Sequence, residues 1–239
     1  DWIKTAQVYF DVIVIVDDAS SDGTYEFLLS ELCELRNLQM YKLPENSGRP
    51  SLPRNFGLKV INDIDRIVFL DIDDKLPITY LKFLRSNRVR RSQDIFSGVK
   101  YSTIKDYFNL FYQSDFSRSR VISPTSLRVK NQVVFSGSSV PLRVAKSVQF
   151  INLPLEDWFY WLDISRVDTW SGDFIRLLDV PIKYDTSATL SPAKVTQIIR
   201  VKNNLNFFSF ILYLYQTLRL KSEEWSLRLR YWLASKKST

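Results

Sequence analysis

A run of five β-branched residues at positions 12–16 is the feature that most constrains the fold of this chain. Val and Ile at every position predict a strand that is covered on both faces, as strands are inside a parallel sheet. The run ends at Asp17 and Asp18, in a polar turn. Apolar residues then recur at helical spacing over 25–35, so the segment predicts the strand–turn–helix unit of an α/β protein.

The same alternation continues through the first 190 residues. Six further elements are expected from their apolar patterns: strands at 38–43, 66–70, 94–101 and 133–140, and helices at 55–61 and 155–164. This order predicts an α/β fold with a mostly parallel sheet flanked by helices. Aromatic and basic residues then dominate, with helices expected at 195–220 and 225–233. We therefore expect one domain at 1–190 and a carboxyl-terminal helical appendage at 191–239.

The chain contains no histidine and a single cysteine, Cys33. Without histidine, Ser-His-Asp and Cys-His catalysis and histidine-bound zinc are excluded, which leaves carboxylates as acid–base and metal-binding groups. Cys33 lies among leucines at helical spacing, so we expect a buried apolar filler and a reducing compartment. No signal peptide or membrane-spanning run is evident, and we expect a cytoplasmic protein.

Basic residues give the chain a net charge of +7 and gather at 85–91, 118–130 and 219–237. No nucleic-acid-binding motif accompanies them, so we expect no nucleic-acid partner. The segment 219–237 combines this charge with aromatic residues. It suits peripheral contact with the inner face of the plasma membrane, or packing against the first domain or another subunit of an oligomer, and both interpretations stay open.

Two of the expected strands end in acidic clusters. Asp17 and Asp18 follow the first strand, and Asp71, Asp73 and Asp74 follow the strand at 66–70. Ligands bind beyond the carboxyl ends of strands in open α/β sheets, and carboxylates gathered there repel one another unless a cation is present. Mg²⁺ or Mn²⁺, held together with substrate phosphate oxygens, would relieve the repulsion. The alternative is that these residues cap the helices that follow.

A loop rich in Gly and Pro contains Asn46 and Gly48 and leads to Arg54 at a helix start. The amino end of a helix with an arginine beside it favours an anion such as a nucleotide phosphate. The alternative is an ordinary loop with a solvated arginine.

Glu156 and Asp157 begin another expected helix, beside Trp158 and Trp161. A carboxylate against apolar rings can act as a base, and a tryptophan face can stack on a sugar ring. Acidic residues are also favoured in the first turn of any helix, so a purely local explanation remains.

Five motifs in this order resemble the family 2 glycosyltransferases, over about residues 5–165: segments 16–24, 46–48, 54–57, 70–74 and 156–157. The resemblance implies the GT-A fold, a nucleotide-diphospho-sugar donor and inversion at the anomeric carbon. It also implies a glycan or lipid-linked acceptor, in surface polysaccharide or capsule synthesis.

On the donor side, the resemblance implies that Asp18 contacts the base of the nucleotide, which we expect to be uracil. Asp17 would support that turn, and Arg54 would lie near the ribose or diphosphate. Asn46 and Gly48 belong to the same implied nucleotide site.

On the catalytic side, the resemblance implies that Asp71 and Asp73 hold the metal, with Asp74 as an adjacent ligand. Asp71 would also approach the nucleotide. Asp157 corresponds to the catalytic base, and Glu156 is its neighbour. Without histidine, we expect the donor diphosphate to complete the metal coordination.

Two departures from the family pattern stand out. Relatives begin with a strand that helps to hold the nucleotide, whereas this chain opens on what resembles the following helix, so we expect residues to be missing upstream. Many relatives also have a histidine after the base motif, and segment 182–186 has none.

Two other functions are compatible with parts of the sequence. A haloacid-dehalogenase-type phosphatase would use Asp71 as its nucleophile, although the residues after Asp74 fit that motif poorly. A non-enzymatic basic module for membrane surfaces is the second alternative.

Overall fold

The computed structural model describes residues 2–101, 119–129, 131–153 and 155–183. Helices and strands follow one another there in this order: α1 (Trp2–Ala6), the 3-10 helix η1 (Gln7–Tyr9), β1 (Ile13–Asp17), α2 (Thr24–Glu31), β2 (Leu38–Lys42), α3 (Ser51–Val60), β3 (Arg66–Val68), α4 (Ile78–Leu84), α5 (Asn87–Arg91), β4 (Ile95–Tyr101), β5 (Ser119–Ile122), α7 (Pro124–Val129), β6 (Ser139–Pro141), α8 (Leu142–Lys146), α9 (Glu156–Ile164) and β7 (Phe174–Lys183). No helix in these ranges is both long and apolar enough to cross a bilayer. The expected appendage at 191–239, with its segment 219–237, lies outside the described residues.

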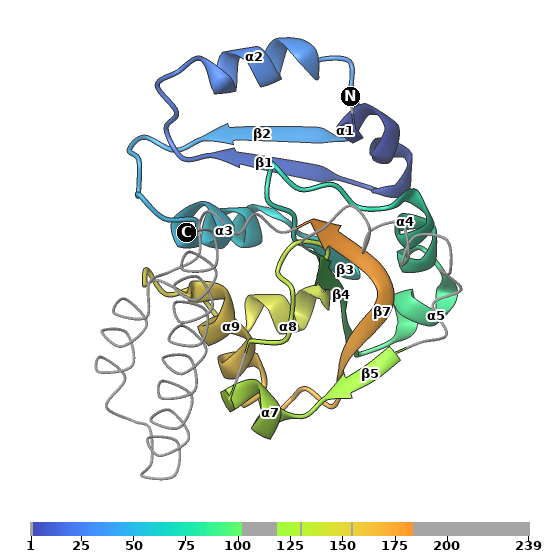
Figure 1. Ribbon diagram of the computed structural model, residues 1–239. Coiled ribbons are helices and arrows are strands. Elements are labelled where there is room, and N and C mark those ends of the chain that lie inside the picture. Colours follow the sequence, from blue (N-terminus) through green and yellow to red (C-terminus); the bar gives the residue numbers. More distant parts are fainter. Residues whose placement is uncertain (1, 102–118, 130, 154, 184–239) are drawn as a thin grey trace, which may run out of the picture.

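The described strands form two separate sheets. β1 and β2 make a parallel pair, while five strands make a larger sheet in the order β3-β6-β4-β7-β5. Figure 1 shows the pair at the top of the molecule, with α2 above it and α3 below it, and the long, curved β7 in the larger sheet. The strands are flanked by helices, so the predicted α/β class is confirmed.

Strand direction in the larger sheet differs from the prediction. β6 runs antiparallel to β3 and β4, and β5 runs antiparallel to β7, so that β4–β7 is the parallel pair of this sheet. The architecture is therefore mixed rather than mostly parallel. An apolar run reads the same in either direction, so periodicity alone did not reveal which strands would reverse.

Two elements differ from their expected bounds. α3 begins at Ser51 rather than at 55, because Pro53 lies in the first turn, where a missing N–H costs no helical hydrogen bond. The expected strand at 133–140 is reduced to β6 at its end. Gly137 adopts a φ of 79° and turns the chain just before it.

Cys33 is exposed, contrary to the expected buried position. α2 ends at Glu31, so the helical spacing that would have turned Cys33 inward does not continue that far. Leu32 and Leu35 are buried there instead.

The larger sheet has an aromatic core. Trp161, Tyr160 and Phe174 are buried, and the Phe150 ring stacks on Tyr160 with 3.9 Å between ring centroids. Tyr80 centres a second cluster, and its hydroxyl donates to the Gly137 carbonyl at 2.7 Å. These two clusters form the described hydrophobic core around the larger sheet.

A cavity of about 850 Å³ lies between the two sheets, with walls formed by β1, β3 and α3. Because the cavity runs along β1, the apolar residues 13–16 are only half-buried. Among the described residues, no strand pairs with the remaining edge of β1 or of β3. The cavity is therefore apolar along its walls and bordered by unpaired backbone.

Candidate functional site

The turn after β1 holds both of its aspartates through hydrogen bonds. Asp17 is buried and accepts from the Ser20 N–H at 2.8 Å. Asp18 accepts from the Ser47 N–H, at 3.1 Å to each carboxylate oxygen, and from the Ser47 hydroxyl at 2.8 Å. Ala19 adopts a φ of 56°, which is uncommon for a residue with a side chain. Asp17 thus holds the turn, and Asp18 ties it to the loop at 46–49.

The loop at 46–49 is closed by its own polar groups. The Gly48 N–H donates to Asn46 Oδ1 at 2.7 Å, and the Arg49 carbonyl lies 2.7 Å from the Ser47 hydroxyl, whose single hydrogen it shares with Asp18. Gly48 adopts a φ of 67°, where a side chain would be strained. The turn places Asn46 and Gly48 in the cavity lining with Asp18.

The acidic turn after β3 is anchored by its backbone and exposes its side chains. The Asp71 N–H donates to the Ser136 hydroxyl at 3.1 Å, and the Asp74 N–H donates to the Asp71 carbonyl at 3.0 Å. Ile72 is 70% exposed, and Asp73 is also exposed. The exposed Asp73 carboxylate is therefore accessible to a ligand from solvent.

Arg54, in the first turns of α3, joins this acidic turn to the start of α9. Its Nη2 donates to Asp71 Oδ1 at 2.8 Å, and its Nη1 donates to Glu156 Oε1 at 2.6 Å. The guanidinium also lies over the Phe135 ring, 3.6 Å from the centroid. The side chains of Arg54 and Glu156 are only 12% and 13% exposed, so this ion pair is largely shielded from water, whereas the Asp71 side chain is 42% exposed.

This observation changes the expected role of Arg54. The resemblance implied a residue near the ribose or diphosphate, whereas both of its terminal nitrogens bind carboxylates of the protein. Arg54 does line the cavity. Its direct contact with a nucleotide remains a prediction.

The two carboxylates at the start of α9 have different partners. Glu156 is held by Arg54, whereas Asp157 Oδ2 accepts from the Asn131 side-chain amide at 2.8 Å. Burial raises the pKa of Glu156 against the pull of Arg54, and the charge of Asp157 adds to the rise. Among the described residues, a cation pairs with Glu156 but none pairs with Asp157.

The backbone before these carboxylates is in an unusual conformation. Leu155 precedes α9 with a φ of 64°, in the left-handed region that glycine normally occupies. Such conformations persist only where the surrounding structure imposes them, and they gather at functional sites.

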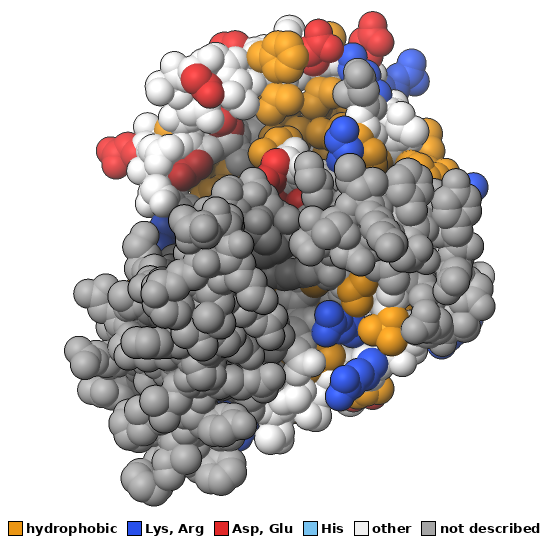
Figure 2. Space-filling view, viewed as in Figure 1, with side chains coloured by type: hydrophobic (Ala, Val, Ile, Leu, Met, Phe, Trp, Pro, Cys, Tyr) orange, Lys and Arg blue, Asp and Glu red, His pale blue; other side chains and the backbone are white. Residues whose placement is uncertain are grey.

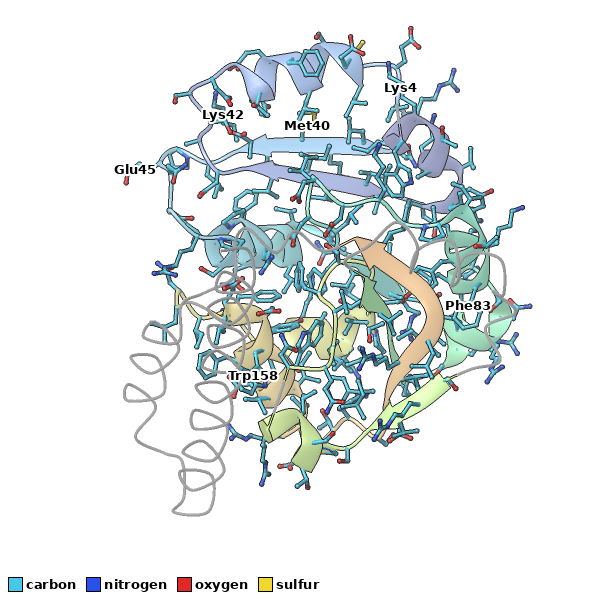
Figure 3. The ribbon with its side chains drawn as sticks, viewed as in Figure 1. Lys4, Met40, Lys42, Glu45, Phe83 and Trp158 are labelled. Carbon is cyan, nitrogen blue, oxygen red and sulfur yellow. The ribbon has the colours of Figure 1, made fainter. Side chains whose placement is uncertain are left out.

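The tryptophans of α9 do not both fit the expected sugar-stacking role. Trp161 is 0% exposed and packs among Phe135 and Phe174, so its face is not available to a ligand. Trp158 is half-buried, and its indole N–H donates to the Leu127 carbonyl of α7 at 2.7 Å. Figure 3 shows Trp158 on the side of α9 that faces α7. The prediction that Trp161 stacks on a sugar ring is therefore wrong. Stacking of Trp158 on a sugar ring remains a prediction.

The cavity gathers most of the expected donor-side residues in its lining: Asp18, Asn46, Gly48, Arg54, Asp71, Asp73 and Asp74. Asp157 is not among its lining residues and is connected to it through the Arg54–Glu156 pair. Figure 2 shows acidic side chains beside an apolar area in the upper part of the molecule.

The donor set of the acidic turn suits a hard divalent cation, because it consists of carboxylate oxygens. Asp71 keeps Oδ2 free of any described hydrogen-bond donor, and Asp73 is exposed. Yet in the described ranges no three acidic or cysteine side chains converge on a ready metal position. The residues therefore fit a cation that takes one or two protein ligands and the rest from another molecule.

Four contributors to the site were not singled out in the sequence: Ser47, Asn131, Phe135 and Ser136. Each acts through a partner distant in sequence, so no local pattern marked it. Ser47 belongs to the loop motif at 46–48, and this position in the motif is the one feature of the sequence that pointed to it.

The described fold matches solved structures of glycosyltransferases. S. aureus TarS 1–349 in complex with UDP-GlcNAc aligns with a TM-score of 0.57 at 20% identity, over 82% of this chain and 57% of that chain. A second structure of TarS 1–349 gives a TM-score of 0.51 at 19% identity, over 84% and 60%.

A further match is the mannosyltransferase PcManGT from Pyrobaculum calidifontis in complex with GDP-Man and Mn²⁺. It aligns with a TM-score of 0.54 at 16% identity, over 88% of this chain and 62% of that chain. The chain has the GT-A fold. It spans less than two thirds of each of these structures. No sequence profile of a known family and no curated protein sequence matches it.

Proposed function

We propose that this protein is an inverting glycosyltransferase that moves a sugar from a nucleotide-diphospho-sugar, with UDP as the expected nucleotide, to an acceptor hydroxyl. The observation that carries the proposal is the bridge from Asp71 through Arg54 to Glu156. It connects a donor-side acidic turn to the helix that begins with the candidate base. The GT-A fold supports the same conclusion, since matched structures hold UDP-GlcNAc and GDP-Man.

In the proposed reaction, Asp157 removes the proton from the acceptor hydroxyl. The acceptor oxygen then forms a bond to the anomeric carbon as the bond from that carbon to the diphosphate oxygen breaks, which inverts the configuration. Glu156 is less suited to this role, because its carboxylate is already paired with Arg54 at 2.6 Å.

The acidic turn would hold a divalent ion through Asp73 and Asp71, with Asp74 adjacent. Mn²⁺ or Mg²⁺ bound there would offset the charge that develops on the departing diphosphate. Asp18, Asn46 and Gly48 would lie along the nucleotide.

The acceptor we expect is a glycan or lipid-linked glycan of a surface polysaccharide or capsule. Contact with the inner membrane face through 219–237 belongs to the same proposal.

Calorimetric titration with UDP in the presence of Mn²⁺ or Mg²⁺ tests the donor site. We expect metal-dependent binding, weakened about tenfold or more by Asp73→Ala, because the exposed carboxylate would be lost as a ligand. Asp168→Ala is the matched control, since Asp168 is exposed and lies outside the cavity lining.

The titration is repeated with other nucleoside diphosphates. If no nucleoside diphosphate binds with either metal, the proposed function is wrong.

A further inference from the structure

Asn131 contacts the candidate base from a separate part of the chain. Its Nδ2 donates to Asp157 Oδ2 at 2.8 Å, across 26 residues of sequence. Asn131 lies just beyond α7 and belongs to none of the motifs in the sequence.

The orientation of the Asn131 amide is fixed by Asp157. An ionised carboxylate can only accept hydrogen bonds, so the amide nitrogen must be the atom that faces it. The consequence appears at the other end of the amide, where Asn131 Oδ1 is buried without a hydrogen-bond partner among the described residues. A side chain that served only its own packing would not keep an unpaired buried acceptor, because such groups destabilise the fold.

A second contact holds the same two elements in register. The Trp158 indole N–H donates to the Leu127 carbonyl at 2.7 Å, and Leu127 is 0% exposed. Successive residues of α9 are therefore tied to the segment at 127–131. The amide of Asn131 is thus presented to Asp157 from a fixed support.

We propose that Asn131 is the positioning residue of Asp157. By occupying Oδ2, it leaves Oδ1 as the oxygen that receives the acceptor proton. The charged groups beside Asp157 are Glu156 and, through it, Arg54. The contact between Asn131 and Asp157 is independent of the proposed function, and the inference rests on that function only in taking sugar transfer as the reaction.

Transfer kinetics provide the first test. We expect Asn131→Ala to lower kcat about 10- to 100-fold, the typical worth of a hydrogen bond to a charged group, with KM for the donor unchanged. The nearly isosteric Asn131→Asp, which lacks the N–H, should lower kcat at least as far and also leave KM for the donor unchanged.

Trp158→Phe is the structural control, since it removes the other bond between α9 and the same segment. It should lower thermal stability without lowering kcat to the same extent. An unchanged kcat in both Asn131 variants, or an equal loss of kcat in Trp158→Phe, would overturn the positioning role.

A substrate-free measurement separates this inference from the proposed function. The side-chain amide NMR signals of Asn131 should follow the titration of a carboxylate in the wild-type chain and stop doing so in Asp157→Asn. Signals that ignore the titration in the wild-type chain overturn the contact, whatever the enzyme does. Wild-type protein that follows the titration but transfers no sugar would refute the proposed function alone.

Discussion

Two pairs of neighbouring carboxylates in this molecule are held in different ways. Asp17 and Asp18, after β1, are bound mainly by the backbone N–H groups of Ser20 and Ser47, and the Ser47 hydroxyl is an additional donor to Asp18. Glu156 and Asp157, at the start of α9, are bound by the side chains of Arg54 and Asn131, 102 and 26 residues away. A backbone donor is present whatever residue carries it, whereas a side-chain donor is lost with a single substitution. The second pair therefore depends on the identity of distant residues, and the first depends on the shape of its turn.

The largest expected effect is on Asp157. Asp157→Asn should lower kcat by about 10² to 10⁴, the usual contribution of a general base, while the Kd of the nucleotide stays nearly the same. Single-turnover transfer together with calorimetry measures both. Asp163→Asn is the control on the same helix, and an equal loss in both variants would remove Asp157 from the proposed role.

Arg54 tests the side-chain-dependent pair directly. Arg54→Ala should lower the free energy of unfolding by about 3–5 kcal/mol, because it leaves Glu156 buried without its cation. The Glu156 side chain is only 13% exposed, so water cannot fully replace the arginine. Urea unfolding monitored by tryptophan fluorescence measures the change.

Arg49→Ala is the matched control for this variant, since Arg49 is an exposed arginine of the preceding loop. We expect Arg49→Ala to change the free energy of unfolding by less than about 0.5 kcal/mol. Similar losses in the two variants would mean that the Arg54 bridge does not stabilise the fold.

For the pair at Asp17 and Asp18, stability should depend on the side chain that accepts the hydrogen bond and not on the side chain of the residue whose N–H donates it. Asp17→Ala should lower the free energy of unfolding by about 1–3 kcal/mol, because the partly buried Ser20 N–H loses its acceptor and the turn around Ala19 loses this hydrogen bond. Ser20→Ala keeps the donating N–H and should cost little. Urea unfolding of both variants decides the matter, and a larger loss in Ser20→Ala would contradict the distinction between the two pairs.

The same distinction explains which features could be predicted from the sequence. β1, β2 and the first residues of α2 follow from patterns within a few residues, and their positions agree with expectation. The carboxylates at both turns were also recognisable, because acidic residues after a strand form a local pattern.

Features that depend on tertiary contact were not predictable in this way. Trp161 looked as suitable for a sugar as Trp158, since a helical pattern does not say which of two aromatic residues the core will enclose. The role of Asn131 exists only because α7 and α9 pack together. Strand reversal at β6 likewise depends on how the turn at Gly137 redirects the chain.

The smallest expected effect is the pH dependence that Glu156 gives to folding. Burial raises the pKa of Glu156 above its ordinary value of 4.5. A carboxyl group with a higher pKa in the folded state favours folding when it is protonated. Its contribution is therefore complete below the unfolded pKa and is lost as pH rises through the folded pKa.

Glu156→Gln lacks this titration, so the stability of wild type relative to the variant should fall as pH rises above the ordinary pKa of 4.5. Urea unfolding at several pH values measures the difference, and exposed Glu34→Gln is the control. If the difference in unfolding free energy between wild type and Glu156→Gln stays constant with pH, burial does not raise the pKa of Glu156. Because the charge of Arg54 opposes the rise in the pKa of Glu156, the loss of stability should extend to higher pH when the same comparison is made in Arg54→Ala protein. That extension would show that the buried carboxylate at α9 depends on one distant side chain for its charge.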